Sequence, residues 1–393
     1  MIQQEIKKSF ASELKCSVCG AIYPLQTVQT FATCCQQPLV VSYHFDKPFS
    51  KEILRNRPPD MYRYFEMLPV QNEENIISLG EGMTPLLPLK KLGDQDGFPN
   101  LFIKNESLNP TGSFKARGLS MAVSRAKELG IERCIIPTAG NAGGALAAYC
   151  AKAGLECVVV MPRHTPQLFK TECALYGAEV ILVDGLINDC AQRAGEIQKK
   201  DGSFDVSTLK EPYRLEGKKT MGYEIAEQMN WLLPDVIIYP AGGGTGLIGI
   251  WKAFEEMEKL GWIKKPFPKM IAVQAANCAP LLAAAADEAN WKQTFKPQPS
   301  IANGLVVPYP FGLKMMQRVI KESGGVVLTI SEQEMSEGIK EVAKKEGIFL
   351  SPEGSATYKA LHHLIQKNII KKEDKIVLLN TGSGYKYLEN LAL

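Results

Sequence analysis

The stretch DVIIYPAGGGTGLIGI, residues 235–250, decides how this chain is expected to fold. Its first part is a short apolar, β-branched run, which is typical of a strand buried on both faces of a parallel sheet. A helical pattern begins directly after the consecutive glycines. Glycines at such a place let main-chain N–H groups approach an anion, and a helix N-terminus attracts negative charge. The stretch therefore predicts a strand, a phosphate-binding loop and a helix, in that order.

The same alternation of strand and helix fills most of the chain. Seven further runs predict strands, at residues 101–104, 133–138, 157–161, 179–183, 270–275, 326–330 and 375–380. Helical patterns lie between most of them, which indicates mostly parallel sheets covered on both faces. A closed α/β barrel would repeat more evenly. We therefore predict an α/β fold with two doubly wound sheets and a ligand site in the crevice between them.

Three of the predicted strands run into loops of small residues: AGNAGG at 139–144, AGGGTG at 241–246 and TGSG at 381–384. One such loop is an ordinary turn, whereas three favour a shared ligand site at the carboxyl ends of the strands. In the second loop, the residues expected to hold a phosphate are Gly242, Gly243, Gly244 and Thr245.

A dinucleotide is the alternative ligand for that loop, because Gly244, Gly246 and Gly249 also fit the G-x-G-x-x-G pattern. That pattern needs an acidic residue at the end of the next strand to hold a ribose. The next strand ends with Gln274 instead, so a nicotinamide dehydrogenase is the minor alternative. The loop also lacks the lysine of the nucleotide-binding P-loop.

The stretch NPTGSFKARG, residues 109–118, places Lys115 at the start of a predicted helix. The positive field there disfavours an ammonium group and favours the neutral amine. A neutral amine can form a Schiff base with a carbonyl, and pyridoxal phosphate is an aldehyde that carries a phosphate. A solvated surface lysine is the simpler alternative, but the flanking turn and the separate phosphate loop favour the cofactor.

The composition limits the cellular compartment and the classes of binding partner that we expect for this chain. The net charge is +3 over 393 residues, and no basic block indicates a nucleic-acid or membrane partner. The N-terminus lacks the apolar core of a signal peptide, and no apolar run is long enough to span a membrane. Ten cysteines in a chain of this length do not make a disulfide scaffold. We expect a cytoplasmic enzyme that acts on a small molecule.

Segments along nearly the whole chain resemble the threonine synthases, which are pyridoxal-phosphate enzymes of the tryptophan synthase β-subunit fold, or fold type II. The lysine segment at 109–118 carries the general resemblance, and PYRLEGKKTMGYEIAEQ at 212–228 is the most specific match. The other matching segments are LGEGMTPLLPL at 79–89, PTAGNAGGALAAYCAKAGL at 137–155, SPEGSATYKAL at 351–361 and NTGSGYKYL at 380–388.

The resemblance implies roles for individual residues. Lys115 is the implied catalytic residue, which binds the cofactor and then moves protons. The other implied cofactor contacts are Phe114, Asn141, Gly242, Gly243, Gly244, Thr245 and either Thr381 or Ser383, whose hydroxyl would meet the pyridine nitrogen. The implied substrate contacts are Thr138, Arg214 and Lys219. Arg214 is expected to bind the substrate phosphate, with a salt bridge at a helix start as an equal alternative.

The implied reaction converts O-phospho-L-homoserine and water to L-threonine and phosphate, by γ-elimination and β-addition. Three departures from the family pattern lie around the substrate: Ala116 and Ala142 replace the more usual polar residues, and the loop at 241–246 lacks the usual asparagine. They leave open a serine/threonine dehydratase, or a β-replacement enzyme such as a cysteate or cysteine synthase. A non-catalytic sensor is the other class of protein considered, and the retained Lys115 argues against it.

We expect three regions: a Cys-rich N-terminal extension at 1–45, a large cofactor domain formed by 46–120 and 216–393, and a small α/β domain at 121–215. The resemblance implies a homodimer. In the extension, Cys16 and Cys19 have the spacing of half a zinc ribbon. The second half has adjacent Cys34 and Cys35, with Ala32 where a ligand is expected. Zinc on these four cysteines is therefore the weaker expectation, and a metal-free relic is the stronger one.

Overall fold

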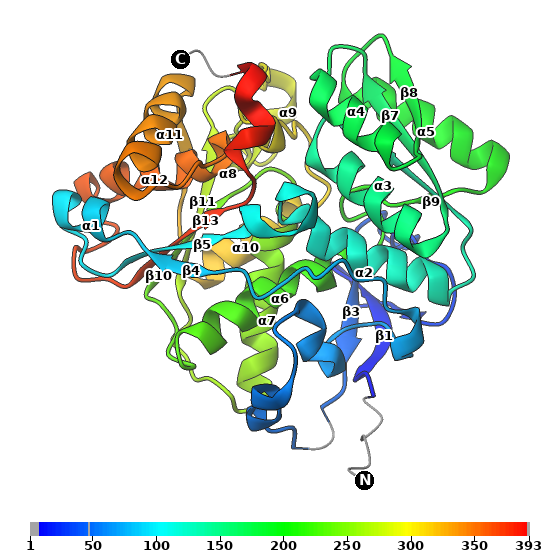
Figure 1. Cartoon of the computed structure of the whole chain (residues 1–393), viewed down its shortest axis with the longest axis horizontal. Coiled ribbons are helices and arrows are strands. Elements are labelled where there is room, and N and C mark those ends of the chain that lie inside the picture. Colours follow the sequence, from blue (N-terminus) through cyan, green and yellow to red (C-terminus); the bar gives the residue numbers. More distant parts are fainter. Residues whose placement is uncertain (1–7, 46–47, 391–393) are drawn as a thin grey trace. The chain divides into compact units, whose positions relative to one another are not determined.

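The structure is a computed structural model that describes residues 8–45 and 48–390 (Figure 1). Its residues form two compact units. The first contains the residues up to Met83 together with Lys115–Thr220, and the second contains Thr84–Phe114 together with the residues from Met221 onward. The described residues up to Met83 thus group with the small α/β sheet, and the domain bounds expected from the sequence stay a prediction.

The second unit is built on a six-stranded sheet in the order β12-β11-β10-β13-β5-β4. The bounds of these strands are Val327–Ile330, Lys269–Ala275, Val236–Pro240, Ile376–Asn380, Leu101–Asn105 and Leu86–Pro88, in that order. The first five are parallel, and β4 is an antiparallel edge strand. At the centre, Ile238 of β10 pairs with Ile271 on one side and Leu378 on the other.

The helices of this unit cover the sheet. They are α1 (Lys90–Asp96), α7 (Thr245–Lys259), α8 (Pro280–Ala286), α9 (Trp291–Thr294), α10 (Leu313–Glu322), α11 (Glu332–Glu346) and α12 (Pro352–Gln366). Helix α12 packs against β10, β11, β12 and β13. It begins after Ser351, whose side chain accepts a hydrogen bond from the Gly354 N–H, with Pro352 as its first residue.

The first unit contains a parallel four-stranded sheet in the order β8-β7-β6-β9. Its strands are Glu179–Val183, Glu156–Pro162, Arg133–Pro137 and Phe204–Asp205, in that order. The helices of this unit are α2 (Lys115–Glu128), α3 (Asn141–Ala153), α4 (Gln167–Leu175), α5 (Ile187–Asp201) and the first part of α6 (Tyr213–Gln228). Alternate side chains face opposite sides. Ile136 and Val159 join the larger core, whereas Ile135 and Val158 pack with Cys190 of α5.

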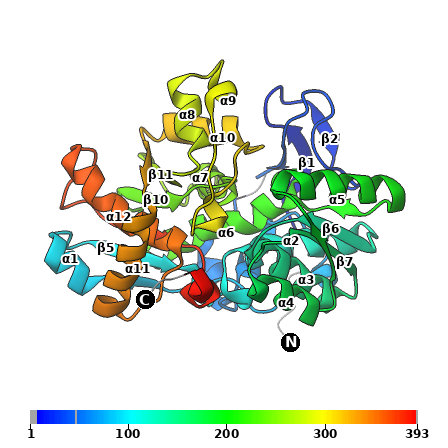
Figure 2. The same cartoon turned by 90° about the horizontal axis from the view of Figure 1, so that it is seen from above.

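A second, antiparallel sheet in the first unit has the order β2-β1-β3. Its strands are β1 (Ala11–Cys16), β2 (Ile22–Pro24) and β3 (Leu39–Tyr43), and Figure 2 shows β1 and β2 side by side. Short 3-10 helices complete the two units: Lys51–Asn56, Met61–Met67, Glu73–Asn75, Glu106–Leu108, Pro110–Gly112, Asn303–Leu305 and Gly384–Asn390.

All eight strands predicted from apolar runs are confirmed, and so is the α/β class with two mostly parallel sheets. Within these two mostly parallel sheets, the strands that were not predicted are β4 and β9, which have only three and two residues. Within the described part of the chain, no helix is both long enough and apolar enough to cross a membrane.

Candidate active site

Three neighbouring strands of the second unit, β10, β13 and β5, are parallel and therefore end at the same edge of their sheet. The segments that follow them are 241–245, 381–383 and 106–114. These segments contain the predicted phosphate loop, the two candidate hydroxyls and the turn that precedes Lys115. The topology thus gathers, at one edge, residues that are far apart in the sequence and that are predicted to bind the cofactor.

The loop between β10 and α7 has a tightly held backbone. Gly244 adopts a φ of 80°, which favours glycine, and a Cβ there would clash with the Met316 side chain. A Cβ on Gly242 would clash with the carbonyl oxygen of Gly304. On the other side of the loop, the Gln274 side chain donates a hydrogen bond to the carbonyl oxygen of Ala241, at 3.0 Å. Gln274 therefore supports this loop from the neighbouring strand.

The turn before the lysine pairs with the segment that follows β13. The Phe114 N–H donates to the Thr381 carbonyl oxygen at 3.0 Å, and the Ser383 N–H donates to the Gly112 carbonyl oxygen at 2.9 Å. Thr381 is buried, whereas Ser383 is half-buried and its hydroxyl accepts a hydrogen bond from the Tyr385 N–H at 3.3 Å. The Phe114 ring lies edge-on to that of Tyr239, with 6.4 Å between the centroids.

Lys115 is half-buried and is the first residue of α2, as the sequence predicts. In the first unit, α2 and α6 cross at very short range. A Cβ on Gly217 of α6 would clash with the carbonyl oxygen of Arg117, and a Cβ on Gly118 of α2 would lie 2.9 Å from the carbonyl oxygen of Arg214. This close crossing fixes the first turn of α2, where the lysine lies.

The other glycine loop of the first unit connects β6 to α3. The Thr138 N–H donates to the Val160 carbonyl oxygen at 3.0 Å, and the Thr138 hydroxyl accepts from the Gly140 N–H at 3.3 Å. Asn141 is the first residue of α3 and is half-buried. Thr138 and Asn141 thus lie in one loop at the carboxyl end of β6.

The start of α6 is held by a buried carboxylate. Glu211 accepts hydrogen bonds from the N–H groups of Tyr213 and Arg214, at 2.7 and 3.0 Å. Burial raises the pKa of Glu211 to about 7, against the opposing effect of Arg214. Burial also lowers the pKa of Arg214, whose guanidinium donates to the Val206 carbonyl oxygen at 2.6 Å.

Lys219 is fully buried, and its ammonium lies 2.6 Å from a carboxylate oxygen of Glu216. The same ammonium lies 3.8 Å from the centre of the Tyr43 ring, and the Tyr43 hydroxyl donates to Glu216 at 2.7 Å. The structure thus gives Lys219 partners within the protein. A contact between Lys219 and the substrate stays a prediction.

Two buried cations near this segment were not selected from the sequence. Arg117 and Lys218 are both fully buried, and Arg117 donates to the Thr220 hydroxyl at 2.9 Å. Their positions in the sequence could have indicated them, because Arg117 lies two residues after Lys115 and Lys218 lies within the most specific family segment. Arginine and lysine side chains usually lie in solvent, so the sequence did not single these two out.

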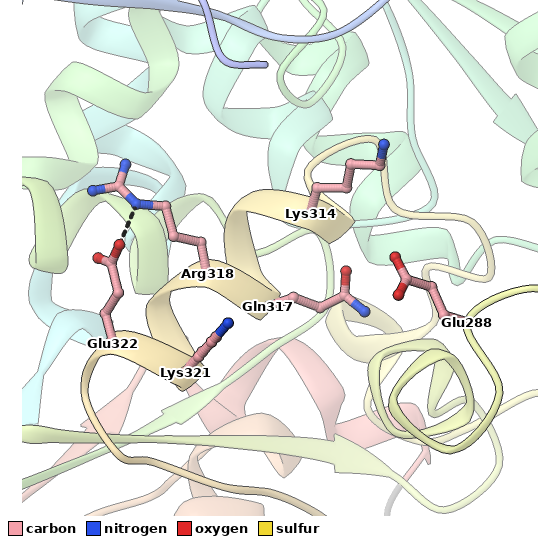
Figure 3. A pocket seen from close by; sticks show the side chains of 6 residues that line it. All are labelled: Glu288, Lys314, Gln317, Arg318, Lys321 and Glu322. Carbon is pink, nitrogen blue, oxygen red and sulfur yellow. Dashed lines mark hydrogen bonds and ion pairs between the residues drawn. The ribbon is translucent and has the colours of Figure 1, made fainter. Parts of the chain in front are cut away.

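A surface pocket of about 680 Å³ lies along α10 of the second unit (Figure 3). Charged and polar side chains of both signs line it, and Arg318 pairs with Glu322 at 2.8 Å. The residues that line it are Glu288, Lys314, Gln317, Arg318, Lys321 and Glu322. None of them is a predicted site residue, so this pocket is separate from the predicted chemistry.

The residues present fit pyridoxal phosphate. The 15-residue helix α7 offers N-terminal amides and the Thr245 hydroxyl to a phosphate. Lys115 offers an amine at another helix N-terminus, and Thr381 and Ser383 offer uncharged hydroxyls to a ring nitrogen. This donor set suits an aldehyde that carries a phosphate and an aromatic nitrogen.

Comparison with known proteins agrees with this chemistry. Residues 77–382 match the family described as pyridoxal-phosphate dependent enzymes. The chain is 36% identical to a threonine synthase of Methanocaldococcus jannaschii, over 95% of this chain and 92% of that protein. It is 32% identical to a threonine synthase of Methanosarcina acetivorans, over 94% and 91%.

Solved structures agree in fold. The processed form of threonine deaminase isoform 2 from Solanum lycopersicum superposes with a TM-score of 0.61 at 22% identity, over 76% of this chain and 79% of that one. The sequence relationship is therefore the more informative of the two. On these grounds the chain belongs to the pyridoxal-phosphate-dependent enzymes, as a lyase of the threonine synthase family.

Proposed function

We propose that this enzyme is a threonine synthase, which converts O-phospho-L-homoserine and water to L-threonine and phosphate. The observation that carries the proposal is the buried segment at the start of α6, which matches the family's most specific segment. It places Arg214, Lys218 and Lys219 in the interior of one unit, together with Arg117 of α2. Lys219 already pairs with Glu216, and Arg214 lies near Glu211. A substrate phosphate would add a further anionic contact for Arg214, which a substrate without a phosphate would not offer.

Bound pyridoxal phosphate would withdraw electrons from the substrate, so that protons next to the amino group become acidic. The Lys115 amine would bind the cofactor aldehyde and then, once freed, carry protons to and from the substrate carbons. The amides of Gly242, Gly243 and Gly244, with the Thr245 hydroxyl, would hold the cofactor phosphate. Asn141 would donate a hydrogen bond to the cofactor ring oxygen, and Phe114 would pack near the ring.

Thr381 is the stronger candidate for the pyridine nitrogen, since it is buried directly after β13, whereas the Ser383 hydroxyl already accepts from Tyr385. A neutral hydroxyl there would leave the ring nitrogen unprotonated. On the substrate, Thr138 and the amides after it would bind the carboxylate. Arg214 would bind the departing phosphate, with Lys219 behind it.

The first test concerns the cofactor and Lys115. Borohydride reduction of the loaded wild-type enzyme should attach the cofactor covalently to the peptide that contains Lys115, and peptide mass spectrometry would locate it. Lys115→Ala should bind the cofactor without this attachment and should lose turnover by a factor of ~10³ or more. Attachment to another lysine would contradict the assignment.

The second test concerns the substrate. Phosphate and threonine release from O-phospho-L-homoserine should exceed ketoacid formation from serine or threonine. Arg214→Gln should raise the KM for phosphohomoserine by about tenfold or more, as expected for a lost charged contact. Borohydride attachment at Lys115 in the variant would show that its site is still folded. Equal turnover of wild type and variant would refute the phosphate role.

A serine/threonine dehydratase or a β-replacement enzyme is the alternative proposal. The observation in its favour is that Ala116 and Ala142, beside two predicted site residues, are buried and carry no polar group. The relatives commonly have polar residues there. Ketoacid as the dominant product from serine or threonine would favour the dehydratase, and sulfide or sulfite incorporation would favour β-replacement.

We also propose that the enzyme works in the cytoplasm as a homodimer. The large cofactor domain would comprise 46–120 and 216–393, and the small domain 121–215. Sedimentation of the purified enzyme would measure the subunit number. Limited proteolysis would show whether cleavage separates the proposed domains.

A further inference from the structure

The sulfur atoms of four cysteines meet at the end of the small antiparallel sheet. The Sγ atoms of Cys16, Cys19, Cys34 and Cys35 all lie within 4.8 Å of one another. Those of Cys19 and Cys34 are 3.4 Å apart. A zinc ion with four thiolate ligands at about 2.3 Å has ligand atoms about 3.8 Å apart. The Cys19 and Cys34 sulfurs would separate slightly to reach this spacing, and any pair near the 4.8 Å limit would close by about 1 Å.

The first pair of cysteines is held by a tight turn at the end of β1. The Gly20 N–H donates to the Cys16 carbonyl oxygen at 3.0 Å, and Gly20 adopts a φ of 73° that favours glycine. The turn therefore holds the sulfurs of Cys16 and Cys19 close together at the end of β1.

The second pair lies at the tip of another tight turn. Ala32 and Gln37 close it with an isolated bridge, in which the Ala32 N–H donates to the Gln37 carbonyl oxygen at 2.8 Å. Gln36 adopts a φ of 51°, so the chain reverses directly after Cys35. The turn brings both adjacent sulfurs to the first pair. Ala32 therefore belongs to the closure of the turn, and the ligand that the sequence places there is supplied from its tip.

We infer that Cys16, Cys19, Cys34 and Cys35 bind one zinc ion in a closed structural site. The four thiols release four protons as Zn²⁺ binds, so the site carries a net charge of −2, and no oxidant or reductant takes part. All four ligands come from the protein, so no position stays open for a substrate, and the site is separate from the chemistry proposed above. It stabilises a sheet whose strands have only six, three and five residues.

Metal analysis of the full-length holoenzyme tests the site. We expect one zinc per chain after purification, with an apparent Kd of about 50 nM or tighter. Substitution with cobalt should give the intense visible absorption of tetrahedral cobalt thiolates. The double variant Cys19→Ser/Cys34→Ser should lose the zinc and the cobalt spectrum. Val18→Ala, which changes an exposed side chain between two ligands, should keep both.

Three results would overturn the inference: no zinc in the wild type with four free thiols, equal zinc in the double variant, or a disulfide among the four cysteines by mass spectrometry. If the double variant fails to fold, removal of metal from the wild type with a mercurial reagent and titration back with zinc supply the same measurement. Threonine formation is a separate readout, so failure of the zinc site and failure of the proposed reaction are distinguishable.

Discussion

Two loops of this molecule both connect a parallel strand to a helix, but they differ in how closely the surrounding residues pack against their glycines. Each follows a buried parallel strand and opens a long helix: residues 138–140 lead from β6 into α3, and residues 241–244 lead from β10 into α7. In the second loop, Gly242 and Gly244 each meet a neighbour that leaves no room for a Cβ. In the first loop, a Cβ on Gly140 would meet nothing within 4 Å.

The difference separates two uses of glycine at a strand end. In the loop before α7, glycine is required by the packing of the protein itself, through Gly304 and Met316, so the positions of its amides are fixed. A preorganised set of amides suits an invariant group such as a cofactor phosphate. In the loop before α3, packing leaves Gly140 open. That loop suits the variable partner, the substrate.

The largest expected effect comes from filling the tight loop. Gly242→Ala would place a methyl group against the Gly304 carbonyl oxygen, and overpacking of this kind costs about 1–3 kcal/mol. We expect a matching loss in the free energy of unfolding, measured in urea, and at least tenfold weaker cofactor binding, measured by titration of the apoenzyme. Unchanged stability and affinity would show that this loop is as adaptable as the other.

A third loop, which follows β9 in the first unit, contains a buried carboxyl group, Glu211, whose charge depends on pH. The pKa of Glu211 is raised to about 7 by burial, from an ordinary value of 4.5. The folded state therefore holds a proton that the unfolded chain releases, so stability falls as the pH rises from 4.5 to 7 and levels off above that. Its steepest slope for one group is about 1.4 kcal/mol per pH unit.

Glu211→Gln should remove this slope, since an amide keeps an oxygen acceptor for the Tyr213 and Arg214 N–H groups without titrating. Urea unfolding of wild type and variant at several pH values between 4.5 and 8 would measure it. Parallel pH profiles for the two proteins would contradict the role of Glu211. A flatter profile in the variant would show that this loop, unlike the one before α7, responds to solution conditions.

Much of this arrangement could be predicted from the sequence. The apolar runs locate eight strands because strands buried on both faces need no polar residues, and loops of small residues mark three of their ends. Strand β9, with two residues, carries too short a pattern to recognise. The burial of Arg214 and Lys219 was also beyond reach, since charged residues rarely lie inside a protein and their partners are set by tertiary packing.

The cysteine cluster shows a different limit. Sequence spacing suggests that Cys34 and Cys35 are too close together to bind one metal ion, and that Ala32 occupies a ligand position. The backbone conformation at Gln36, with its φ of 51°, and the bridge from Ala32 to Gln37 instead bring both sulfurs close to those of Cys16 and Cys19. Neither feature can be recognised in the amino-acid sequence, because glutamine seldom adopts a positive φ.

The smallest expected effect comes from the open loop. Gly140→Ala should change the free energy of unfolding by no more than about 0.5 kcal/mol, because its φ of −173° is extended backbone and its Cβ would have free space. Gly143→Ala is the matched control three residues later. Its Cβ would lie 2.9 Å from side-chain atoms of Met161 and Thr138, so it should destabilise the protein.

If Gly140→Ala instead raised the KM for the amino-acid substrate at unchanged stability, the added methyl group would lie where the substrate binds. Equal loss of stability in both variants would mean that the loop before α3 is as tightly packed as the loop before α7, and the distinction between the two would fall.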